Sequence, residues 1–518
     1  MSIHTTPALI ITLSILIFLQ GCQQPTLEPE PPTIVDVHDG DTVDLSADVI
    51  TKEINGAAHE MYAYNNIIPG VTLRTTQGSR FTVNFHNNLP HETTIHWHGL
   101  RHNIKDDGVP DISQQPVQPG DTYTYTIYTP DEGIFLYHPH VREDLQQDLG
   151  LAGNLLVTAN EGTPPVNNEE LLVLDDILIE HDQIVPYGKE YANFAIMGRF
   201  GNIMLVNGQT DYHLTVNKGD IVRFYITNVA NARPFNLSFD GAAVKLIGSD
   251  LSVYEQESFI DEVLIAPAER YIVDAYFENE GPYTIVHTTP EKTYALGNIH
   301  VTDHETDHNY TRAFHTLASN APLSEDINRF KASFDAPPDY TIDLTIDMGM
   351  MEGMIHDDTP TSNDLSTDGK SLVHHIGMEG MTETDHTMIE WEDDMGMMNA
   401  QSTSEQVTWI LKDRETEQEN MNFMMNARVG DIIKIRLFND PNSMHPMQHP
   451  IHLHGQRFLV LNQDGKQNTN FAWKDTVLVP TGSTVDILVD VTNPGQWMFH
   501  CHIAEHLTAG MMTSLLAT

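Results

Sequence analysis

The most persistent pattern along this chain is a short alternation of apolar and polar residues, interrupted by turn residues. Residues 71–74, 81–85 and 123–127 alternate in this way, and Pro-Gly or Gln-Gly pairs stand between such runs. A period of two over roughly four to eight residues is typical of a strand with one buried face. The pattern therefore predicts an all-β fold made of short-stranded β-sandwich domains.

The alternating runs form three blocks. At roughly 150 residues per domain, the 518 residues allow about three domains, which we place at residues 33–162, 165–305 and 335–518. The third domain includes a methionine-rich insertion at residues 347–405. We expect the second domain to be metal-free, because its block contains no cysteine and no His-X-His motif.

The first 22 residues have the features of a targeting segment. Residues 8–19 form an apolar run that is shorter than the ~20 residues of a membrane-spanning helix. The run ends in Leu-Gln-Gly-Cys, which resembles the lipobox of bacterial lipoproteins. We therefore expect a lipoprotein signal peptide at 1–22, lipidation of Cys22, a Pro/Glu-rich tether at 23–32, and an exported, membrane-anchored protein that faces the periplasm or the cell exterior. An ordinary secretory signal peptide is the alternative.

The charge of the chain is strongly unbalanced. Acidic residues outnumber basic ones by 73 to 26, which gives a net charge of −47. Such a field repels nucleic acid and anionic lipid, and it concentrates cations near the surface. We therefore expect no nucleic-acid partner. Adaptation to a salty medium, or solubility alone, would explain the same charge.

Candidate chemistry begins with four His-X-His motifs, two in the first block and two in the third. On a strand, residues two apart point to the same face, so each motif presents two imidazoles together. Eight imidazoles are enough for three metal ions, and because the motifs come from both ends of the chain we expect a cluster between the first and third domains. The eight residues are His96, His98, His138, His140, His452, His454, His500 and His502.

A second kind of metal site is indicated by the last motif. Cys501 lies between His500 and His502, with His506 five residues and Met511 ten residues further on. A thiolate, imidazoles and a weak axial thioether form the ligand set of a blue-copper site, although zinc also binds cysteine and histidine. If the tripeptide lies on a strand, Cys501 faces away from both histidines, so the tripeptide serves two sites and connects them through covalent bonds. The alternative is a buried cysteine beside chance histidines.

In order and spacing, these motifs resemble those of the multicopper oxidases, from about residue 33 to the C-terminus. The resemblance is closest to the three-domain prokaryotic laccase-like and copper-resistance oxidases, judging by His445-Pro446-Met447-Gln448-His449 and the methionine-rich stretch. It implies three cupredoxin-like Greek-key β-sandwich domains, four copper ions, and four-electron reduction of O2 to water.

The resemblance also implies a role for each ligand. The type 1 copper takes His449, Cys501, His506 and Met511, and the type 2 copper takes His96 and His452. One type 3 copper takes His98, His138 and His502, and the other takes His140, His454 and His500. Cys501 then passes electrons to the cluster, and Asp107 supplies protons or supports the ligands. Some family members have a carboxylate where this chain has Leu507; Glu505 is a weak substitute, which a solvated position would explain equally well.

The methionine-rich stretch bears on the substrate. Residues 347–425 contain 13 of the 22 methionines, in clumps separated by glycine and interleaved with Asp, Glu and His. Thioethers are soft ligands that favour Cu(I), so we hypothesise a copper-binding surface near the type 1 site; an insertion with incidental methionines is the alternative. The candidate ligands for substrate copper are Met348, Met350, Met351, Met354, Met395, Met397, Met398 and Met447.

These patterns together favour a monomeric oxidase that uses O2 and a small reductant. Cu(I) is the favoured reductant, with a role in copper tolerance, and phenols or Fe(II) are the rivals of Cu(I). A copper nitrite reductase would not need four His-X-His motifs, and for a non-enzymatic copper-sequestering protein the eight histidines would be surplus.

Overall fold

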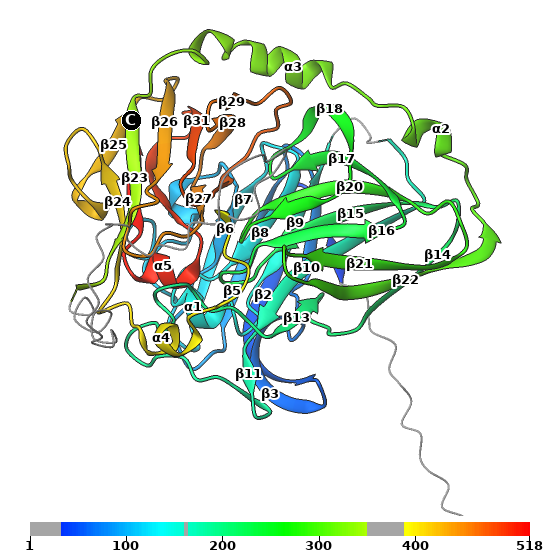
Figure 1. Cartoon of the computed structure of the whole chain (residues 1–518), viewed down its shortest axis with the longest axis horizontal. Helices are drawn as coiled ribbons and strands as arrows, with labels where there is room; N and C mark the ends of the chain where they lie inside the picture. Colours follow the sequence, from blue (N-terminus) through cyan, green and yellow to red (C-terminus); the bar gives the residue numbers. More distant parts are fainter. Residues whose placement is uncertain (1–32, 160–163, 350–387) are drawn as a thin grey trace, which may run out of the picture. The chain divides into compact units, whose positions relative to one another are not determined.

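The computed structural model describes residues 33–159, 164–349 and 388–518. Within these ranges the chain consists mainly of strands, which form six large sheets and one two-stranded sheet (Figure 1). This confirms the predicted all-β fold. Cys22, the predicted signal peptide and the tether lie outside the described residues, as does most of the predicted methionine-rich insertion. No helix in the described part of the chain combines the length and the apolar character needed to cross a membrane.

The first domain pairs a five-stranded sheet in the order β1-β4-β9-β8-β6 with a four-stranded sheet in the order β3-β2-β5-β7. In β5, Phe81, Val83 and Phe85 are buried and alternate with more exposed neighbours, as a strand with one buried face requires. The elements are β1 (Ile34–Asp36), β2 (Thr42–Ile54), β3 (Ala57–Tyr64), β4 (Thr72–Thr76), β5 (Arg80–Asn87), β6 (His96–His98), η1 (Ile104–Asp106), β7 (Thr122–Tyr128), β8 (Gly133–His138), α1 (Glu143–Gln146) and β9 (Gly153–Thr158).

The second domain pairs sheets in the orders β13-β10-β15-β20-β17-β18 and β14-β22-β21-β16-β19. β15 lies between β10 and β20 and is buried along its whole length, which fits a mostly apolar sequence without clear alternation. The strands are β10 (Asn168–Ile177), β11 (Ile179–Glu180), β12 (Gln183–Ile184), β13 (Ile203–Val206), β14 (Tyr212–Lys218), β15 (Ile221–Asn228), β16 (Phe235–Asp240), β17 (Ala243–Ser249), β18 (Ser252–Ile260), β19 (Val263–Ile265), β20 (Arg270–Tyr276), β21 (Gly281–Thr288) and β22 (Thr293–Glu305).

A connecting segment with short helices leads to the third domain. It contains α2 (Thr311–Phe314), α3 (Ala321–Asn328) and the 3-10 turn η2 (Lys331–Ser333). α3 begins after Asn320, whose side chain accepts a hydrogen bond from the N–H of Leu323 at 2.9 Å and so caps the helix. In Figure 1 this segment runs over the upper edge of the strands.

The third domain pairs sheets in the orders β24-β23-β26-β31-β28-β29 and β25-β33-β32-β27-β30. Its elements are β23 (Tyr340–Asp347), α4 (Gly396–Gln401), β24 (Thr408–Asp413), η5 (Asn420–Asn422), β25 (Met424–Ala427), β26 (Ile432–Asn439), β27 (His449–Leu453), β28 (Arg457–Gln463), β29 (Lys466–Gln467), β30 (Thr476–Val479), β31 (Thr484–Asp490), β32 (Gly495–Cys501), α5 (Ala504–Thr508) and β33 (Met512–Ala517).

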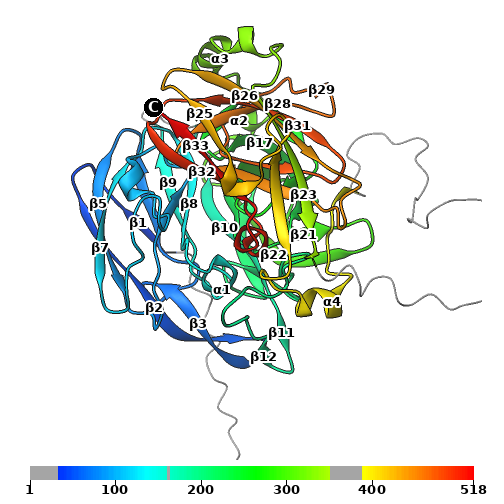
Figure 2. The same ribbon diagram turned by 90° about the vertical axis from the view of Figure 1, so that its left-hand side faces the viewer.

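The first and third domains share apolar contacts. The main core of the first domain is continuous with Leu459, Trp473 and Leu488 of the third domain. In Figure 2 the blue strands of the first domain accordingly lie beside the orange and red strands of the third. This contact brings β6 and β8 of one domain towards β27 and β32 of the other, and these four strands carry the His-X-His motifs.

Candidate metal centres

The four His-X-His motifs all lie at or near strand ends. They occupy β6, the end of β8, β27 with the residue after Leu453, and the end of β32. β6 pairs with β8 so that His96 lies opposite His138, and β27 pairs with β32 so that His452 lies opposite His500. Each of the two domains therefore presents four imidazoles from one strand pair.

Imidazoles from the two domains stack on one another. The ring centroids of His96 and His454 are 3.9 Å apart with an interplanar angle of 29°, and those of His98 and His452 are 3.6 Å apart with an angle of 17°. All eight histidines are buried. They form a single cluster to which both domains contribute.

In several of these rings one nitrogen is hydrogen-bonded and the other has no partner in the described part of the chain. Nδ1 of His96 lies 2.7 Å from the carbonyl oxygen of Asp107, and Nδ1 of His452 lies 2.9 Å from that of Asp475. A carbonyl oxygen only accepts, so each Nδ1 carries the hydrogen and each Nε2 carries the lone pair of the neutral ring. Both Nε2 atoms are buried and have no partner within the described residues. His98, His138 and His140 each have one such nitrogen as well, and both nitrogens of His502 lack a partner within the described residues.

Buried polar atoms without partners cost about 1–3 kcal/mol each, so their concentration at one point requires an explanation. His454 and His500 supply it: their Nε2 atoms face each other at 2.9 Å. Nδ1 of His454 donates to the carboxylate of Asp107 at 3.0 Å, and Nδ1 of His500 donates to the carbonyl of Cys501 at 2.8 Å. The lone pairs of the two Nε2 atoms therefore point at each other. A cation bound between them would remove the repulsion of these lone pairs. The donor set fits metal ions, and imidazole suits copper.

Burial keeps several rings of the cluster unprotonated. Loss of solvation lowers the pKa of His140 to about 3, and it lowers the pKa of His138, His454 and His500 well below the usual value, with the neighbouring rings acting in the same direction. A ligating imidazole must offer a free lone pair. These four rings are therefore able to bind metal at neutral pH without first losing a proton.

Asp107 contacts two of the rings from the loop after η1. Its carboxylate bonds His454 and its carbonyl bonds His96. Burial raises the pKa of Asp107, but nearby imidazoles, that of His96 foremost, outweigh this effect and leave the pKa below its usual value. Gly108 permits the close approach of the loop: its φ is +82°, and a Cβ there would lie 1.9 Å from the carbonyl oxygen of Ile95.

Cys501 faces a second group of ligands. Its Sγ lies 3.5 Å from Nδ1 of His449 and 3.7 Å from Nδ1 of His506, and these two nitrogens are 3.3 Å apart. The centre of such a triangle is about 2 Å from each corner, which is the length of a metal–imidazole bond. Met511 is buried, and its carbonyl accepts a hydrogen bond from the N–H of Cys501. Burial raises the pKa of the Cys501 thiol, so a bound cation would be needed to hold it as thiolate.

An indole covers the imidazoles of this second group. The ring of Trp409 stacks on His506 at 4.1 Å and meets His449 edge-on at 4.8 Å. Its Nε1 donates to the carbonyl of Ala195 in the second domain at 2.8 Å. His449 is 1% exposed and His506 is 0% exposed, so neither ring offers an edge to a large molecule in solution.

Several residues at these sites were missed by the sequence analysis. Asp475 lies 2.9 Å from Nε2 of His98, although the two residues are 377 positions apart, and no sequence signal connects them. Trp409 likewise comes from a distant strand. Glu143 places a carboxylate oxygen 3.2 Å from Nδ1 of His140, and an acid three residues after a motif histidine is a signal that could have been noticed.

Two expectations about individual side chains need correction. Met348 and Met447 are buried, at 1% and 0% exposure, and both belong to the apolar core of the third domain, so they are not part of an exposed copper-binding surface. Glu505 is also buried rather than solvated, and its Oε1 accepts a hydrogen bond from Asn231 at 3.2 Å. Glu505 lies in the first turn of α5, and its side chain faces the second domain.

The remaining candidate methionines divide by position. Met397 and Met398 of α4 are 80% and 39% exposed, and Met395 is partly buried against the core. Met350, Met351 and Met354 lie outside the described residues.

Comparison with known proteins agrees with this geometry. Family models described as multicopper oxidase match residues 47–162, 171–311 and 386–518. Copper resistance protein A of Escherichia coli is 25% identical over 572 aligned positions, covering 91% of this chain and 92% of that protein. Laccase-2 of Fomitopsis schrenkii is 28% identical over 499 positions, covering 90% and 88%.

A solved structure gives the same result for the fold. A multi-copper oxidase from Pseudomonas thermotolerans matches with a TM-score of 0.66 and 23% identity, covering 94% of this chain and 100% of that chain. The three matching models and the relatives span nearly the whole described chain. This chain belongs to the multicopper oxidase family, and it is an oxidoreductase whose cofactor is copper.

Proposed function

We propose that this chain oxidises Cu(I) at a type 1 copper and passes the electrons to a trinuclear copper cluster that reduces O2 to water. The type 1 copper would be held by Cys501, His449, His506 and Met511, and the eight motif histidines would hold the other three copper ions. Bound copper supplies the one-electron steps and the site for O2. Support comes from the partnerless nitrogens of the cluster and the triangle of donors around Cys501.

The chain itself holds the donors and connects the two sites. Cys501 is bonded directly to His500 and His502, whose ring centroids are 5.5 Å apart. Covalent bonds therefore lead from the thiolate to two ligands of the cluster. Asp107 keeps the hydrogen of His454 on Nδ1, which directs the lone pair of that ring towards metal. We also assign Asp107 to proton supply, because its carboxylate contacts that ring.

The observation that favours Cu(I) as substrate is a histidine beside the type 1 ligands. His445 lies close enough for a charge on its ring to lower the pKa of His449 and His506. Its own Nε2 is buried and has no partner in the described part of the chain. Burial lowers the pKa of His445, and the negative charge of Asp394 acts in the opposite direction. We infer that His445 and Asp394, with the thioether of Met444, which is 46% exposed, would offer soft and anionic ligands to a copper ion that approaches this side of the type 1 ligands.

A phenol has poorer access to the type 1 site than a metal ion has. An organic donor needs the exposed edge of a type 1 imidazole, and Trp409 covers both His449 and His506. A copper ion needs only His445 and its neighbours. Fe(II) is the remaining rival, but a thioether favours the softer Cu(I).

Replacement of His445 by alanine tests this assignment. The KM for Cu(I) should rise about 10-fold, the cost of one lost ligand at about 1.4 kcal/mol, while the KM for a small phenol stays unchanged. The control is His213→Ala in the second domain, because Nε2 of His213 lies 2.7 Å from Asp211 and His213 belongs to neither proposed copper site. Copper content and blue colour must equal those of the parent in both variants. An unchanged KM for Cu(I), or an equal rise for the phenol, would argue for a laccase-like phenol oxidase instead.

A further inference from the structure

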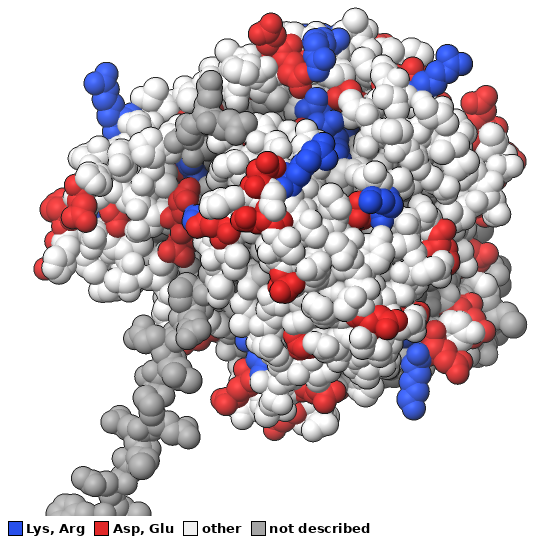
Figure 3. All heavy atoms as spheres, turned by 180° about the vertical axis from the view of Figure 1, so that it is seen from behind, with Lys and Arg blue, Asp and Glu red and all other residues white. Residues whose placement is uncertain are grey.

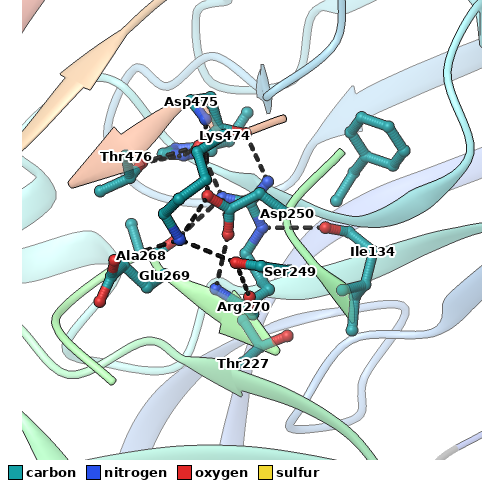
Figure 4. Close-up of polar contacts among 12 residues, drawn as sticks. Ile134, Thr227, Ser249, Asp250, Ala268, Glu269, Arg270, Lys474, Asp475 and Thr476 are labelled. Atoms are coloured by element: carbon teal, nitrogen blue, oxygen red, sulfur yellow. Dashed lines mark hydrogen bonds and ion pairs between the residues drawn. The ribbon is translucent and has the colours of Figure 1, made fainter. Parts of the chain in front are cut away.

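The second domain reaches the copper cluster through a buried arginine. Arg270 begins β20 and is 0% exposed. Its Nη1 donates to Oδ1 of Asp475 at 2.7 Å, and its Nη2 donates to Oδ2 of the same carboxylate. Asp475 immediately precedes β30 of the third domain and is also 0% exposed. Figure 4 shows the two side chains at the centre of a network of buried charges. A paired arrangement of this kind fixes the plane of the carboxylate.

Asp475 contacts two of the proposed copper ligands. Its Oδ1 lies 2.9 Å from Nε2 of His98, and its carbonyl oxygen lies 2.9 Å from Nδ1 of His452. Thr476 donates to the same Oδ1 at 2.7 Å. The hydrogen of His98 is therefore held on Nε2, and its Nδ1, which is buried without a partner in the described chain, carries the lone pair. Oγ1 of Thr476 also lies 3.0 Å from Nε2 of His98. The carboxylate of Asp475 and the hydroxyl that donates to it therefore together decide which nitrogen of His98 is offered to metal.

Arg270 is held in place by groups from the first and second domains. Its Nε donates to the carbonyl of Ile134 in the first domain at 2.9 Å, and its Nη1 donates to the carbonyl of Ala268 at 2.9 Å. The carboxylate of Asp250 accepts a hydrogen bond from the N–H of Arg270 at 3.0 Å. With Asp475 from the third domain, this one guanidinium joins all three domains.

In the first domain, a glycine leaves room for the same ion pair. Gly99 directly follows His98 and has a φ of +89°. A Cβ at Gly99 would lie 2.4 Å from Oδ2 of Asp475 and 3.0 Å from Nη2 of Arg270. The space beside His98 is therefore filled by the Arg270–Asp475 pair, and a side chain at this position would displace it.

A second buried cation, Lys474, belongs to the same network but contacts none of the proposed copper ligands in the described part of the chain. Nζ of Lys474 lies 3.1 Å from Asp250 and 3.2 Å from Glu269, and it donates to Ser249 at 2.7 Å. Every charge in Figure 4 therefore has an opposite charge within reach, as buried ions require. Lys474 and its partners connect the second and third domains, whereas Arg270 alone among the two cations bonds the carboxylate that faces His98.

We propose that Arg270 is a positioning residue for the trinuclear cluster. It fixes both oxygens of Asp475, so that Asp475 holds the Nε2 hydrogen of His98 and leaves Nδ1 directed at copper. The domain without copper ligands thereby sets the geometry of the cluster, in addition to joining the other two. This inference rests on the proposed assignment of His98 and His452 as copper ligands.

The test compares two buried arginines of the second domain. Arg270→Leu removes the pair with Asp475. Arg223→Leu is the matched control, because Arg223 is also buried and bonds both oxygens of Asp274, at 2.8 and 2.9 Å, away from the cluster. For each variant and the parent, copper-free protein is titrated with copper. The measurements are bound copper per chain, the electron paramagnetic resonance signal of type 2 copper, and the blue absorption of type 1 copper.

The expected result is selective. Arg270→Leu should weaken copper binding at the cluster by about 10- to 100-fold, the usual effect of losing a partner that orients a ligand, and should change the type 2 signal while the blue absorption is kept. Arg223→Leu should lower thermal stability but leave copper binding and both signals as in the parent.

Several outcomes would overturn the proposal. One is an unchanged cluster affinity and type 2 signal in Arg270→Leu, and another is an equal loss in Arg223→Leu, which would show a general effect on stability. If Arg270→Leu does not fold, the proposal is tested with Arg270→Lys, which should show the same changes in copper affinity and type 2 signal. Lysine keeps the charge but cannot bond both oxygens of Asp475 in the same way. If the parent itself binds no copper at the cluster, the ligand assignment fails first and this proposal fails with it.

Discussion

Cys501 connects the two candidate copper sites while its side chain faces only one of them. Its Sγ belongs to the triangle with His449 and His506, and its carbonyl accepts a hydrogen bond from His500 of the cluster. Replacement by serine would remove the thiolate but keep this backbone contact. The thiolate is the ligand responsible for intense blue colour, so colour and cluster should be separable at this residue.

We therefore expect Cys501→Ser to lose the blue absorption and to retain the cluster. Copper analysis should fall from about four to about three ions per chain, because a serine hydroxyl is a poor copper ligand. The type 2 paramagnetic signal should remain and confirms folding. A variant that stays blue would show that Cys501 is not the type 1 ligand.

His287 gives a residue-scale prediction that does not involve copper. It is buried in the second domain, its Nδ1 accepts the N–H of Asn236 at 3.0 Å, and its ring stacks on Tyr294. Burial lowers its pKa from 6.5 to about 4. Between these pH values the unfolded chain binds a proton that the folded chain does not, so stability should fall as the pH drops from about 6.5 towards about 4.

The contribution of this one group at pH 5 is about 2 kcal/mol, from about 1.4 kcal/mol per unit of pKa difference. His287→Gln keeps an acceptor for Asn236 and does not titrate. The loss of stability between pH 7 and pH 5, measured by urea unfolding of the copper-loaded protein, should be smaller in the variant by about this amount. Equal losses in both proteins would mean that His287 is already charged, or already solvated, in the folded state.

At the scale of elements, the local sequence pattern predicted the strands, whereas the contacts between strands of different domains depend on tertiary packing. The alternation at residues 81–85 became β5, with Phe81 and Phe85 inside, because a period of two is fixed by the strand itself. The same rule places both rings of a His-X-His motif on one side. His500 and His502 keep this relation with ring centroids 5.5 Å apart, although the strand ends at Cys501.

Contacts between elements left no such trace in the sequence. The carboxylate of Asp475 reaches His98 from another domain, and the indole of Trp409 reaches His506 from β24. Both depend on how the domains meet, which no local period encodes. Met348 shows the opposite error: it begins a methionine clump, yet it directly follows β23 and continues the inward face of that strand.

At the scale of the whole molecule, the dominant property is the net charge of −47. Figure 3 shows acidic side chains at many places on one face, with basic side chains among them and no single acidic patch. A distributed charge of this size attracts cations from every side at low salt. It acts on the rate of encounter between the protein and its substrate, and its effect depends on the charge of that substrate.

The proposed substrate is a cation, so its oxidation should be sensitive to ionic strength. Between about 0.01 M and about 1 M salt the Debye length shortens from about 30 Å to about 3 Å, and kcat/KM for Cu(I) should fall by about 10-fold or more as attraction is screened. The salt must have an anion that does not bind Cu(I), because chloride would compete for the metal. An uncharged phenol, oxidised by the same preparation, should show little change and serves as the control for effects of salt on the copper sites. A response of the same size for both donors would mean that the charge does not guide the reductant, and adaptation to a salty medium or solubility alone would then be the better explanation for the acidic surface.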